Sequence, residues 1–584
     1  MLKGRHGLRN VARLPPYGSA ILCKPVTTRF SRHYSSSTEP KDVAILGSGI
    51  TGLATAYYLS QSLPATKITV YEAGSRVGGW LESVKVPIDD GEILFEKGPR
   101  TLRPAGNGIL AARMISELGL QDETIFTLKT APAATNRYIY YPDHLVRVPQ
   151  PDPSKSLWEN VNVIGDSFVH EDAFRGLMSK ILFEHFVRTR DSDVVDESVG
   201  HFFKRRLGKN MVDRVLSAVM HGIYAGDVYK LSMKALFSNL FRLEGESGSL
   251  TLGFLQSFGD GPKIPMREAN FLELMQKPFP FDKQFKKNLM KSSVFTFRNG
   301  LQQLVDALKE DLRGRHNVTF LTNTPIKSID NEGDAVKLWV DGTGEPATHT
   351  HVISSLSPKH LRQVLDKPGV GNYGLHSIGY APTVMTVNLY FRTPNLHPPG
   401  FGYLIPLATS IEQNPERALG VVFDDGYSAA TEDDGHIVGP MQDTVSNRGT
   451  KVTVMLGGHY WDAWNAYPSE EEGVEMALSV VQRHLGITEP PAATGVSLAK
   501  DCIPQYTVGY EDKLKNVHAE LLDRFSGRLR VAGNWFRGVG VNDCLRSAWE
   551  VVRELRDERK TGLEVAVEDK NWVTVQPVQM KKRA

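Results

Sequence analysis

Residues 43–52 read V-A-I-L-G-S-G-I-T-G, a short apolar run followed by three glycines in the pattern G-x-G-x-x-G. The apolar run is typical of a strand buried in a parallel sheet. Apolar residues then recur at helical spacing as far as Leu59, and a second apolar run over residues 67–71 ends just before Glu72. This order of strand, glycine turn, helix and strand predicts a βαβ unit of a doubly wound α/β fold.

Each glycine of the turn has a physical task. Gly47 permits the tight strand-to-helix turn, Gly49 lets a pyrophosphate approach the backbone, and Gly52 lets helix and strand pack closely. The helix N-terminus supplies free N–H groups and partial positive charge for phosphates. Glu72 follows Gly52 by twenty residues, where a carboxylate can bind ribose hydroxyls. The pattern predicts a dinucleotide site but does not separate FAD from NAD.

The next stretch, E-A-G-S-R-V-G-G-W over residues 72–80, resembles the second FAD fingerprint of the glutathione-reductase and amine-oxidase-like flavoproteins. The resemblance implies FAD, with the arginine and the glycine pair continuing the cofactor channel beside the pyrophosphate. An ordinary glycine turn is the alternative interpretation.

The C-terminal part repeats the arrangement. Residues 529–534, L-R-V-A-G-N, predict a strand and turn, and a glycine loop leads to Asn542 and Asp543, which are good helix N-cap residues. Such a helix end would stabilise the negative charge near N1 and O2 of a reduced flavin, although a plain packing helix is the alternative. A flavin site built from both ends implies that the middle of the chain forms a substrate domain.

A third segment is expected to join the cofactor domain. The run R-N-G-L at residues 298–301, followed by a helical pattern and a β-pair, is typical of this flavoprotein class. Ile326 would then lie near the adenine end, and residues 351–355 predict a strand that returns into the nucleotide domain.

Seven short sequence motifs narrow the choice of flavoprotein family. They are F-E-K-G-P-R-T-L-R-P-A-G (95–106), T-N-R-Y-I-Y (135–140), H-G-I-Y-A-G-D (221–227), G-F-G-Y-L-I-P (400–406), V-T-V-M-L-G-G (452–458), C-I-P-Q-Y-T-V-G (502–509) and G-V-G-V-N-D-C (538–544). In this order they resemble the mitochondrial-type protoporphyrinogen oxidase family, over about residues 40–555. The resemblance implies non-covalent FAD and the oxidation of protoporphyrinogen IX to protoporphyrin IX, with hydride removal to flavin N5 and three O2 reduced to hydrogen peroxide. No side chain is assigned a catalytic role, because the flavin carries the hydride step.

Two rival classes remain open. One is another enzyme of the same fold, an amine or polyamine oxidase or a carotenoid-type desaturase, and the other is a non-catalytic FAD-binding scaffold.

The predicted cofactor-binding residues are Gly47, Ser48, Gly49, Ile50, Thr51, Gly52, Glu72, Ala73, Arg76, Gly79, Trp80, Gly98, Pro99, Arg100, Thr101, Ile326, Asn534, Val539, Gly540 and Val541. The predicted substrate-binding residues are Arg137, Val219, Gly222, Phe401, Leu404 and Met455.

The resemblance gives each substrate residue a role. Arg137 would hold a propionate, because a guanidinium binds a carboxylate bidentately; a surface salt bridge is the alternative. Phe401 and Leu404 would flank the tetrapyrrole, Val219 and Gly222 would form the opposite wall, and Met455 would lie near the flavin, with core packing as the alternative for the apolar residues. His221 could serve as a base, but a structural hydrogen bond is the favoured interpretation.

The first 38 residues carry seven of the 68 lysines and arginines, several serines and no acid, which is typical of a mitochondrial transit peptide. Without them the net charge would be about −5, which gives no argument for nucleic-acid binding. The three cysteines form no disulfide framework or metal cluster, so no metal site is expected. The stretch from Thr409 to Thr450, with Glu432, Asp433 and Asp434, is interpreted as a solvated insertion without a role.

No apolar run is long enough to span a bilayer. An apolar helical stripe flanked by basic residues could instead enter a membrane interface, although a buried helix face is the commoner outcome. The stripe consists of Phe174, Leu177, Met178, Ile181, Leu182 and Phe186. The family resemblance implies a monotopic protein of the mitochondrial inner membrane facing the intermembrane space, a homodimer, and contact with ferrochelatase.

The expected fold class is α/β: a discontinuous Rossmann-like FAD-binding domain, a mixed α+β substrate domain and a helical membrane-binding domain. The predicted boundaries are a transit peptide over 1–38, FAD-binding segments over 39–130, 295–365 and 496–584, a membrane-binding domain over 131–245, and substrate segments over 246–294 and 366–495.

Overall fold

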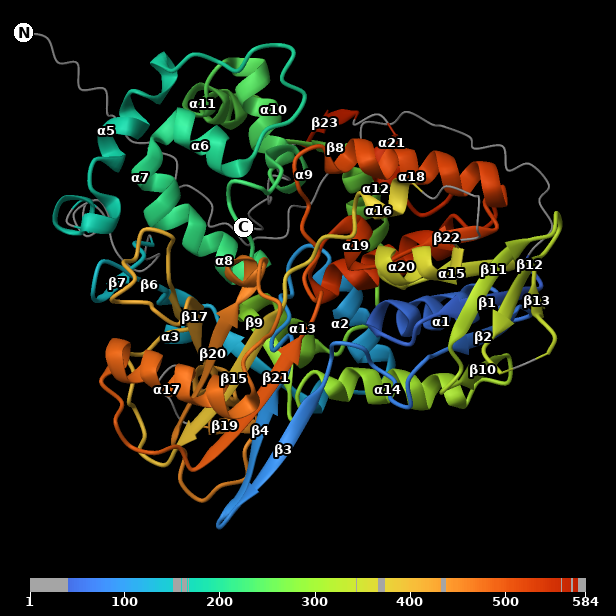
Figure 1. The fold of residues 1–584 in the computed structure, drawn as a ribbon, viewed down its shortest axis with the longest axis horizontal. Coiled ribbons are helices and arrows are strands. Elements are labelled where there is room, and N and C mark those ends of the chain that lie inside the picture. The colour runs from blue at the N-terminus through green and yellow to red at the C-terminus, as the bar shows by residue number, and fades with distance from the viewer. Residues whose placement is uncertain are drawn as a thin grey trace, which may run out of the picture.

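The computed structural model describes residues 40–575, apart from 151–158, 160–164, 166, 343, 366–372, 432–436, 558 and 569–570. The predicted transit peptide therefore lies outside the described residues. Figure 1 shows a parallel sheet with its helices, a large mostly antiparallel sheet, and a group of helices that includes α6, α7, α10 and α11. The α/β fold class predicted from the sequence is confirmed.

The parallel sheet joins distant parts of the chain. Its strand order is β10 (Val318–Leu321), β2 (Lys67–Tyr71), β1 (Asp42–Leu46), β14 (His351–Ser354) and β22 (Leu529–Val531). All four pairings are parallel. The sheet therefore takes strands from all three segments that the sequence assigned to cofactor binding, and residues 42 and 531 lie in one sheet.

The central strand β1 is buried on both faces. Val43 and Ile45 pack into the core formed with α1 (Ile50–Ser62), α2 (Gly108–Glu117), α14 (Gln302–Arg313) and α20 (Val541–Arg553). Ala44 and Leu46 face the opposite way, into the core formed with α15 (Pro358–Leu365) and α18 (Tyr510–Phe525). Alternate side chains of a strand point to opposite faces, so the continuous apolar run Val43–Leu46 is what two covering layers require.

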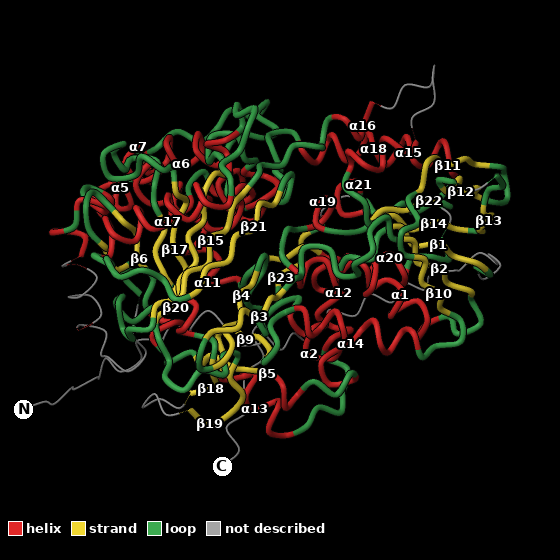
Figure 2. The backbone as a smooth tube through the Cα atoms, turned by 60° about the horizontal axis from the view of Figure 1, so that its bottom comes forward, coloured by secondary structure: helices red, strands yellow, loops and turns green. Residues whose placement is uncertain are grey.

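The second sheet has seven strands. Their order is β21 (Ala493–Ala499), β15 (Val384–Phe391), β20 (Thr450–Gly457), β17 (Ala418–Phe423), β16 (Gly402–Leu404), β6 (Tyr138–Tyr140) and β7 (Leu145–Arg147). The pairings are antiparallel except for β16 with β6. Strands β6 and β7 belong to this sheet although they fall within the segment 131–245 that was expected to be helical. Figure 2 shows the two sheets as separate groups of strands on opposite sides of the molecule.

The helical group surrounds its own small core. It contains α5 (Leu177–Leu182), α6 (Val199–Leu207), α7 (Lys209–Met211), α8 (Ser217–Tyr224), α9 (Met233–Leu236), α10 (Ser238–Ser247) and α11 (Leu250–Asp260). A π-helical turn, η4 (Val212–Leu216), joins α7 to α8. Within the described residues, no helix is both long and apolar enough to cross a membrane.

The remaining elements connect these parts. The strands are β3 (Ser83–Ile88), β4 (Gly91–Glu96), β5 (Thr124–Leu128), β8 (Lys263–Pro265), β9 (Ser292–Phe297), β11 (Ile326–Asn331), β12 (Val336–Val340), β13 (Ala347–His349), β18 (Ala429–Thr431), β19 (Ile437–Met441) and β23 (Trp572–Thr574). The helices are α3 (Pro132–Thr135), α12 (Met266–Met275), α13 (Lys283–Lys291), α16 (Tyr373–His376), α17 (Glu470–Leu485), α19 (Asn534–Arg537) and α21 (Glu564–Val567), and the short 3-10 turns include η3 (Glu184–Phe186), η5 (Asp424–Gly426) and η6 (Gly458–Trp461).

The prediction of a solvated insertion from Thr409 to Thr450 is wrong. This stretch contains β17, η5, β18 and β19, and its Asp424 is buried. Gln442 is also buried and donates a hydrogen bond of 3.1 Å to the carbonyl oxygen of Phe297. The polar residues satisfy buried groups of neighbouring elements, which polarity alone could not reveal. Glu432, Asp433 and Asp434 lie outside the described residues.

Candidate active site

The glycine turn after β1 has almost no spare room. Gly47 adopts a φ of +90°, and a Cβ placed on Gly52 would lie 1.9 Å from the carbonyl oxygen of Gly47. A Cβ on Gly49 would meet only the Cα of Gly79, at 3.8 Å. Glycine is thus needed at positions 47 and 52 for the turn itself, whereas Gly49 leaves the backbone open beside it.

Glu72 lies directly at this turn. Its Oε2 accepts hydrogen bonds from the backbone N (2.9 Å) and the Oγ (2.6 Å) of Ser48, and its Oε1 accepts one from the backbone N of Gly74 (2.9 Å). The backbone N of Thr324 donates to the carbonyl oxygen of Glu72 at 2.8 Å, two residues before Ile326. The residues predicted to hold the ribose and the adenine therefore lie side by side.

The second fingerprint forms a tight loop against the first. A Cβ on Gly79 would lie 3.0 Å from the Cα of Gly49. Arg76 donates hydrogen bonds to the carbonyl oxygens of Leu81 and Gly79, so its guanidinium braces the loop. Ala73 and Gly79 are exposed, and Trp80 is 50% exposed.

The loop after β4 approaches the same place. A Cβ on Gly98 would lie 2.3 Å from the carbonyl oxygen of Trp80. Pro99 is exposed and Thr101 is half-buried, whereas the guanidinium of Arg100 is largely buried with its Nε 3.1 Å from Oδ1 of Asp424. Sequence reasoning missed Asp424, because it lies in the stretch interpreted as solvated.

The C-terminal loop meets the glycine turn from the other side. A Cβ on Gly533 would lie 3.4 Å from Oγ1 of Thr51, near the start of α1. Asn534 and Val539 are half-buried, Gly540 is exposed and Val541 is buried. The two ends of the chain thus bring two helix N-termini, those of α1 and α19, together.

The predicted N-cap of α20 is wrong by two residues. The N-cap is Gly540, and Asn542 and Asp543 lie in the first helical turn. The Asp543 carboxylate accepts hydrogen bonds from the backbone N of Gly540 at 3.2 Å and from Nδ2 of Asn107 at 2.7 Å. A carboxylate three positions into the helix thus binds back to the cap residue, because glycine has no side chain of its own to do so.

These residues fit a dinucleotide. The first turn of α1 carries no acidic residue, and its N-cap is Gly49, so no side chain occupies the free N–H groups. The open backbone at Gly49 and Gly79 lies beside this electropositive helix end, and Glu72 supplies acceptor oxygens.

On the substrate side, Arg137 lies over an aromatic ring and has no acidic partner within the part of the chain that the structure describes. Its Cζ is 5.9 Å from the ring centroid of Phe401, and its buried Nε has no hydrogen-bond partner among the described residues. Burial, and secondarily the neighbouring charge of Arg103, lowers the pKa of Arg137. The alternative of an ordinary surface salt bridge is therefore not what the described structure shows.

Gly222 and Leu404 face one another. A Cβ on Gly222 would lie 2.8 Å from both Cδ atoms of Leu404. Val219 and Ile223 share the exposed side of α8 with Gly222, at 37% and 50% exposure. Ile223 was missed by sequence reasoning, although its spacing of four residues from Val219 places both on one helix face.

Met455 belongs to the same row of the large sheet as Leu404. Gly420 pairs with Leu404 on one side and with Met455 on the other, and Met455 pairs with Thr386. The Oγ1 of Thr386 donates a hydrogen bond of 3.3 Å to the carbonyl oxygen of Lys97. Paired residues share a sheet face, so Leu404 and Met455 lie on the face that meets the predicted cofactor loop.

His221 makes the structural hydrogen bond that the sequence favoured. Its Nδ1 donates to the carbonyl oxygen of Ile405 at 2.7 Å, and its Nε2 lies 2.9 Å from Nε2 of His459. Burial, and then the neighbouring His459, lower the pKa of His221 to about 3. The ring is therefore neutral at ordinary pH.

Comparison with known proteins agrees with this geometry. The family of flavin containing amine oxidoreductases matches residues 50–556, and the chain belongs to this family. It is therefore an FAD-dependent oxidoreductase, as the sequence predicted. Among the described residues, no group of three or more His, Cys, Asp or Glu could hold a metal ion.

Relatives narrow the family further. The chain is 35% identical over 526 residues to a protoporphyrinogen oxidase of Schizosaccharomyces pombe, covering 88% of this chain and 98% of that one. It is 30% identical over 523 residues to a human protoporphyrinogen oxidase, covering 87% and 96%.

Solved structures show the same fold. One is a candidate protoporphyrinogen oxidase from Exiguobacterium, with a TM-score of 0.63, 22% identity and coverage of 90% and 99%. Another is putrescine oxidase bound to putrescine, with a TM-score of 0.54, 14% identity and coverage of 88% and 98%. At these identities they show the fold alone.

Proposed function

We propose that this protein oxidises protoporphyrinogen IX to protoporphyrin IX, with three O2 reduced to three H2O2 as the six hydrogens are removed. The single observation that carries the proposal is the position of Arg137. Its guanidinium lies over the ring of Phe401 and beside a second cation, Arg103, and its buried Nε has no hydrogen-bond partner in the described structure. A guanidinium in this position can bind the carboxylate of a substrate that packs against an aromatic ring, and it would repel a positively charged amine. The protoporphyrinogen oxidases of S. pombe and human, similar over most of their length, support the same substrate.

The residues divide the work. Bound FAD supplies the hydride acceptor. Arg137 would hold a propionate, and its cost of burial is offset only when that carboxylate arrives. Phe401, together with Leu404 and the Gly222 that packs against it, would line the site of the flat macrocycle and exclude water from it.

The test is aerobic turnover of protoporphyrinogen IX by the purified holoenzyme, followed by porphyrin fluorescence and peroxide release. Arg137→Ala should raise KM by about tenfold or more, as expected for a lost charge-assisted hydrogen bond. Arg147→Ala, an exposed arginine on the adjacent strand β7, is the matched control and should leave KM unchanged. An FAD-loaded protein that leaves protoporphyrinogen untouched would refute the proposal, and a panel of amines would be tried next.

We also propose that the protein binds a membrane through one surface of its helical group. This apolar ridge consists of the exposed side chains Met178, Ile181, Leu182, Phe183 and Phe186, with Leu252, Phe254 and Leu255 of α11. Leu182 is 66% and Phe186 75% exposed, which is unusual for side chains of this size. Of the predicted stripe, Phe174 and Leu177 are instead buried and anchor the segment.

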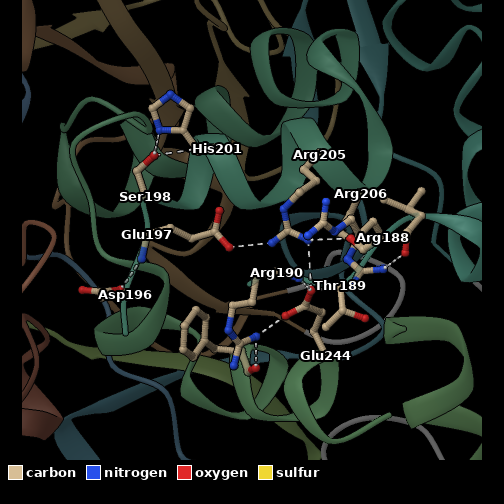
Figure 3. Close-up of polar contacts among 12 residues, drawn as sticks. Arg188, Thr189, Arg190, Asp196, Glu197, Ser198, His201, Arg205, Arg206 and Glu244 are labelled. Carbon is tan, nitrogen blue, oxygen red and sulfur yellow. Dashed lines mark hydrogen bonds and ion pairs between the residues drawn. The ribbon is translucent and has the colours of Figure 1, made fainter. Parts of the chain in front are cut away.

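A polar network holds the ridge in place. Figure 3 shows Arg190, Arg205 and Arg206 converging on Glu244. The fully buried Arg206 also pairs at 3.0 Å with Glu184, which lies within the ridge segment between Phe183 and Phe186. The network ties the backbone segment that carries the ridge to helices α6 and α11.

Exposed Lys180 belongs to α5, the same helix that carries Met178, Ile181 and Leu182 of the ridge, so an anionic lipid surface is the expected partner. We propose the mitochondrial inner membrane, from the intermembrane-space side, reached with residues 1–38 as a transit peptide. Co-sedimentation with phosphatidylcholine–cardiolipin vesicles should be lost in a Leu182→Gln, Phe186→Gln variant and retained in Met290→Gln, an exposed apolar residue on α13. Unchanged sedimentation of the double variant would contradict membrane binding through the ridge.

The homodimer and the contact with ferrochelatase stay predictions, testable by light scattering and by pull-down with purified ferrochelatase.

A further inference from the structure

The π-helical turn η4 and helix α8 form one continuous helix. One face of this helix is hydrogen-bonded to the chain segment that follows β16. Its three contacting residues are spaced four apart, so they lie in one row. The hydrogen bonds run from Ala408 N to Asp213 O at 3.0 Å, from Leu407 N to Ser217 Oγ at 3.0 Å, and from His221 Nδ1 to Ile405 O at 2.7 Å.

The last of these bonds adjoins the slot proposed above for the tetrapyrrole. His221 and Ile405 are the chain neighbours of Gly222 and Leu404, whose atoms face one another. His221 and Gly222 are consecutive residues of helix α8, and Ile405 directly follows Leu404 at the end of strand β16. The bond between His221 and Ile405 therefore limits how far Gly222 and Leu404 can separate. The other two bonds lie further along the helix and control the slot less directly.

His459 fixes the tautomer that this bond needs. A neutral imidazole carries one N–H, and Nδ1 of His221 must carry it to donate to a carbonyl oxygen. Its Nε2 then accepts, so Nε2 of His459 donates across the 2.9 Å contact. His459 is itself held to the end of α8, because its backbone N donates to the carbonyl oxygen of Ala225 at 2.8 Å.

Both nitrogens of His221 are therefore engaged, and neither is free to take a proton from a substrate. We infer that His221 is a positioning residue that keeps Gly222 in contact with Leu404 and so fixes this part of the wall of the slot. The inference rests on the proposed function, because it takes the slot to be the tetrapyrrole site.

The test compares substitutions that keep or remove the bond to Ile405. His221→Asn places an amide N–H close to the position of Nδ1 and should keep KM for protoporphyrinogen IX within about twofold. His221→Leu removes the donor and should raise KM by about tenfold, with kcat changed much less, as for one lost buried hydrogen bond. His221→Gln reaches to the position of Nε2 instead and should resemble His221→Leu. Ser217→Ala, which removes a bond further from the slot, should have the smaller effect.

FAD content and the flavin absorption spectrum report whether each variant folds. If His221→Leu does not fold, the comparison of His221→Asn with His221→Gln still tests the inference. An unchanged KM in His221→Gln, or an equal rise in KM in the Asn and Gln variants, would overturn the inference. Binding of protoporphyrin IX, measured by fluorescence, should weaken in His221→Gln in parallel with KM. A wild-type protein inactive on protoporphyrinogen would refute the proposed function, and the binding measurement would still decide the role of His221.

Discussion

Nε of Arg100 lies 3.1 Å from Oδ1 of Asp424, and this buried ion pair joins the predicted cofactor loop to the end of β17 in the large sheet. Asp424 also accepts hydrogen bonds from Tyr427 and, at 2.5 Å, from Oγ1 of Thr453. The pair directly connects the predicted cofactor loop to the sheet that carries the predicted substrate-binding residues Leu404 and Met455.

Asp424→Asn should therefore destabilise the protein by roughly 3–5 kcal/mol, because it leaves the buried guanidinium of Arg100 without its counter-charge. Urea unfolding and the FAD content after gel filtration measure the effect, and both should fall. Asp89→Asn breaks an exposed pair with Arg392 and should cost at most about 1 kcal/mol. Equal effects of the two substitutions would show that burial of the Arg100 pair has no energetic consequence.

Gly222→Ala should lower kcat/KM for protoporphyrinogen IX by about tenfold or more. The added methyl group would lie 2.8 Å from the Cδ atoms of Leu404, so that Leu404 must shift into the slot. Combining it with Leu404→Ala should restore part of the activity, and steady-state kinetics of the double-mutant cycle measure this coupling. Strict additivity of the two single effects would contradict the contact.

Stability should fall as the pH drops from about 6.5 towards 4. His484 Nε2 donates to the carbonyl oxygen of Gln413 at 2.7 Å and its Nδ1 lies 3.0 Å from the hydroxyl of Tyr403, so a second ring proton would face another donor. Burial is the main cause that lowers the pKa of His484 to about 4. In this window the unfolded chain takes up a proton that the native state does not, which lowers the free energy of unfolding by up to about 1.4 kcal/mol per pH unit.

Urea unfolding at pH 7, 6 and 5 measures this slope. His484→Gln should make it shallower, although it also lowers stability at pH 7. The exposed His376 offers the control, and His376→Gln should leave the slope as in the wild type. If neither substitution changes the pH dependence of the free energy of unfolding, His484 is not the source of the acid sensitivity.

Glu184→Gln should loosen the apolar ridge by about 2–3 kcal/mol, the usual cost of losing hydrogen bonds to a charged group. The carboxylate accepts hydrogen bonds from Ser249 Oγ at 2.5 Å and from the backbone N atoms of Leu250 and Thr251 at 2.9 and 3.0 Å, at the start of α11. Burial opposes ionisation, but these donors keep the pKa of Glu184 below its usual range. Faster hydrogen exchange over residues 177–190 is the expected signature.

The control for this change is Glu246→Gln, an exposed glutamate of α10 that pairs with Arg242 and Lys263. It should leave hydrogen exchange in the ridge unchanged. If Glu184→Gln exchanges like the wild type, the network is not what orders the ridge.

Local patterns predicted the cofactor half of the fold well. Strand β1, its glycine turn and α1 were readable because each depends on residues only a few positions apart, and the close approach of Gly52 to Gly47 follows from the same spacing. Strands β14 and β22 were readable from short apolar runs. The flavin was predictable because its two fingerprints are contiguous in sequence.

Contacts between distant residues could not be predicted in this way. Nothing near Asp424 indicates that Arg100, more than three hundred positions away, is its partner. Strand β6 has only three residues, and it joins the large sheet through a parallel pairing with β16 that no local period encodes. The N-cap at Gly540 escaped because the capping carboxylate, Asp543, lies inside the helix.

The place of β22 at the edge of the parallel sheet has a consequence for the order in which the chain folds. Until residue 531 has been synthesised, the edge of β14 has no neighbour, and helix α20, which completes the core over β1, is also missing. Exposed strand edges and incomplete cores favour aggregation. The nascent protein therefore cannot complete the core of its cofactor domain until α20 has been synthesised, and a chain that stops before α20 lacks part of the predicted flavin site.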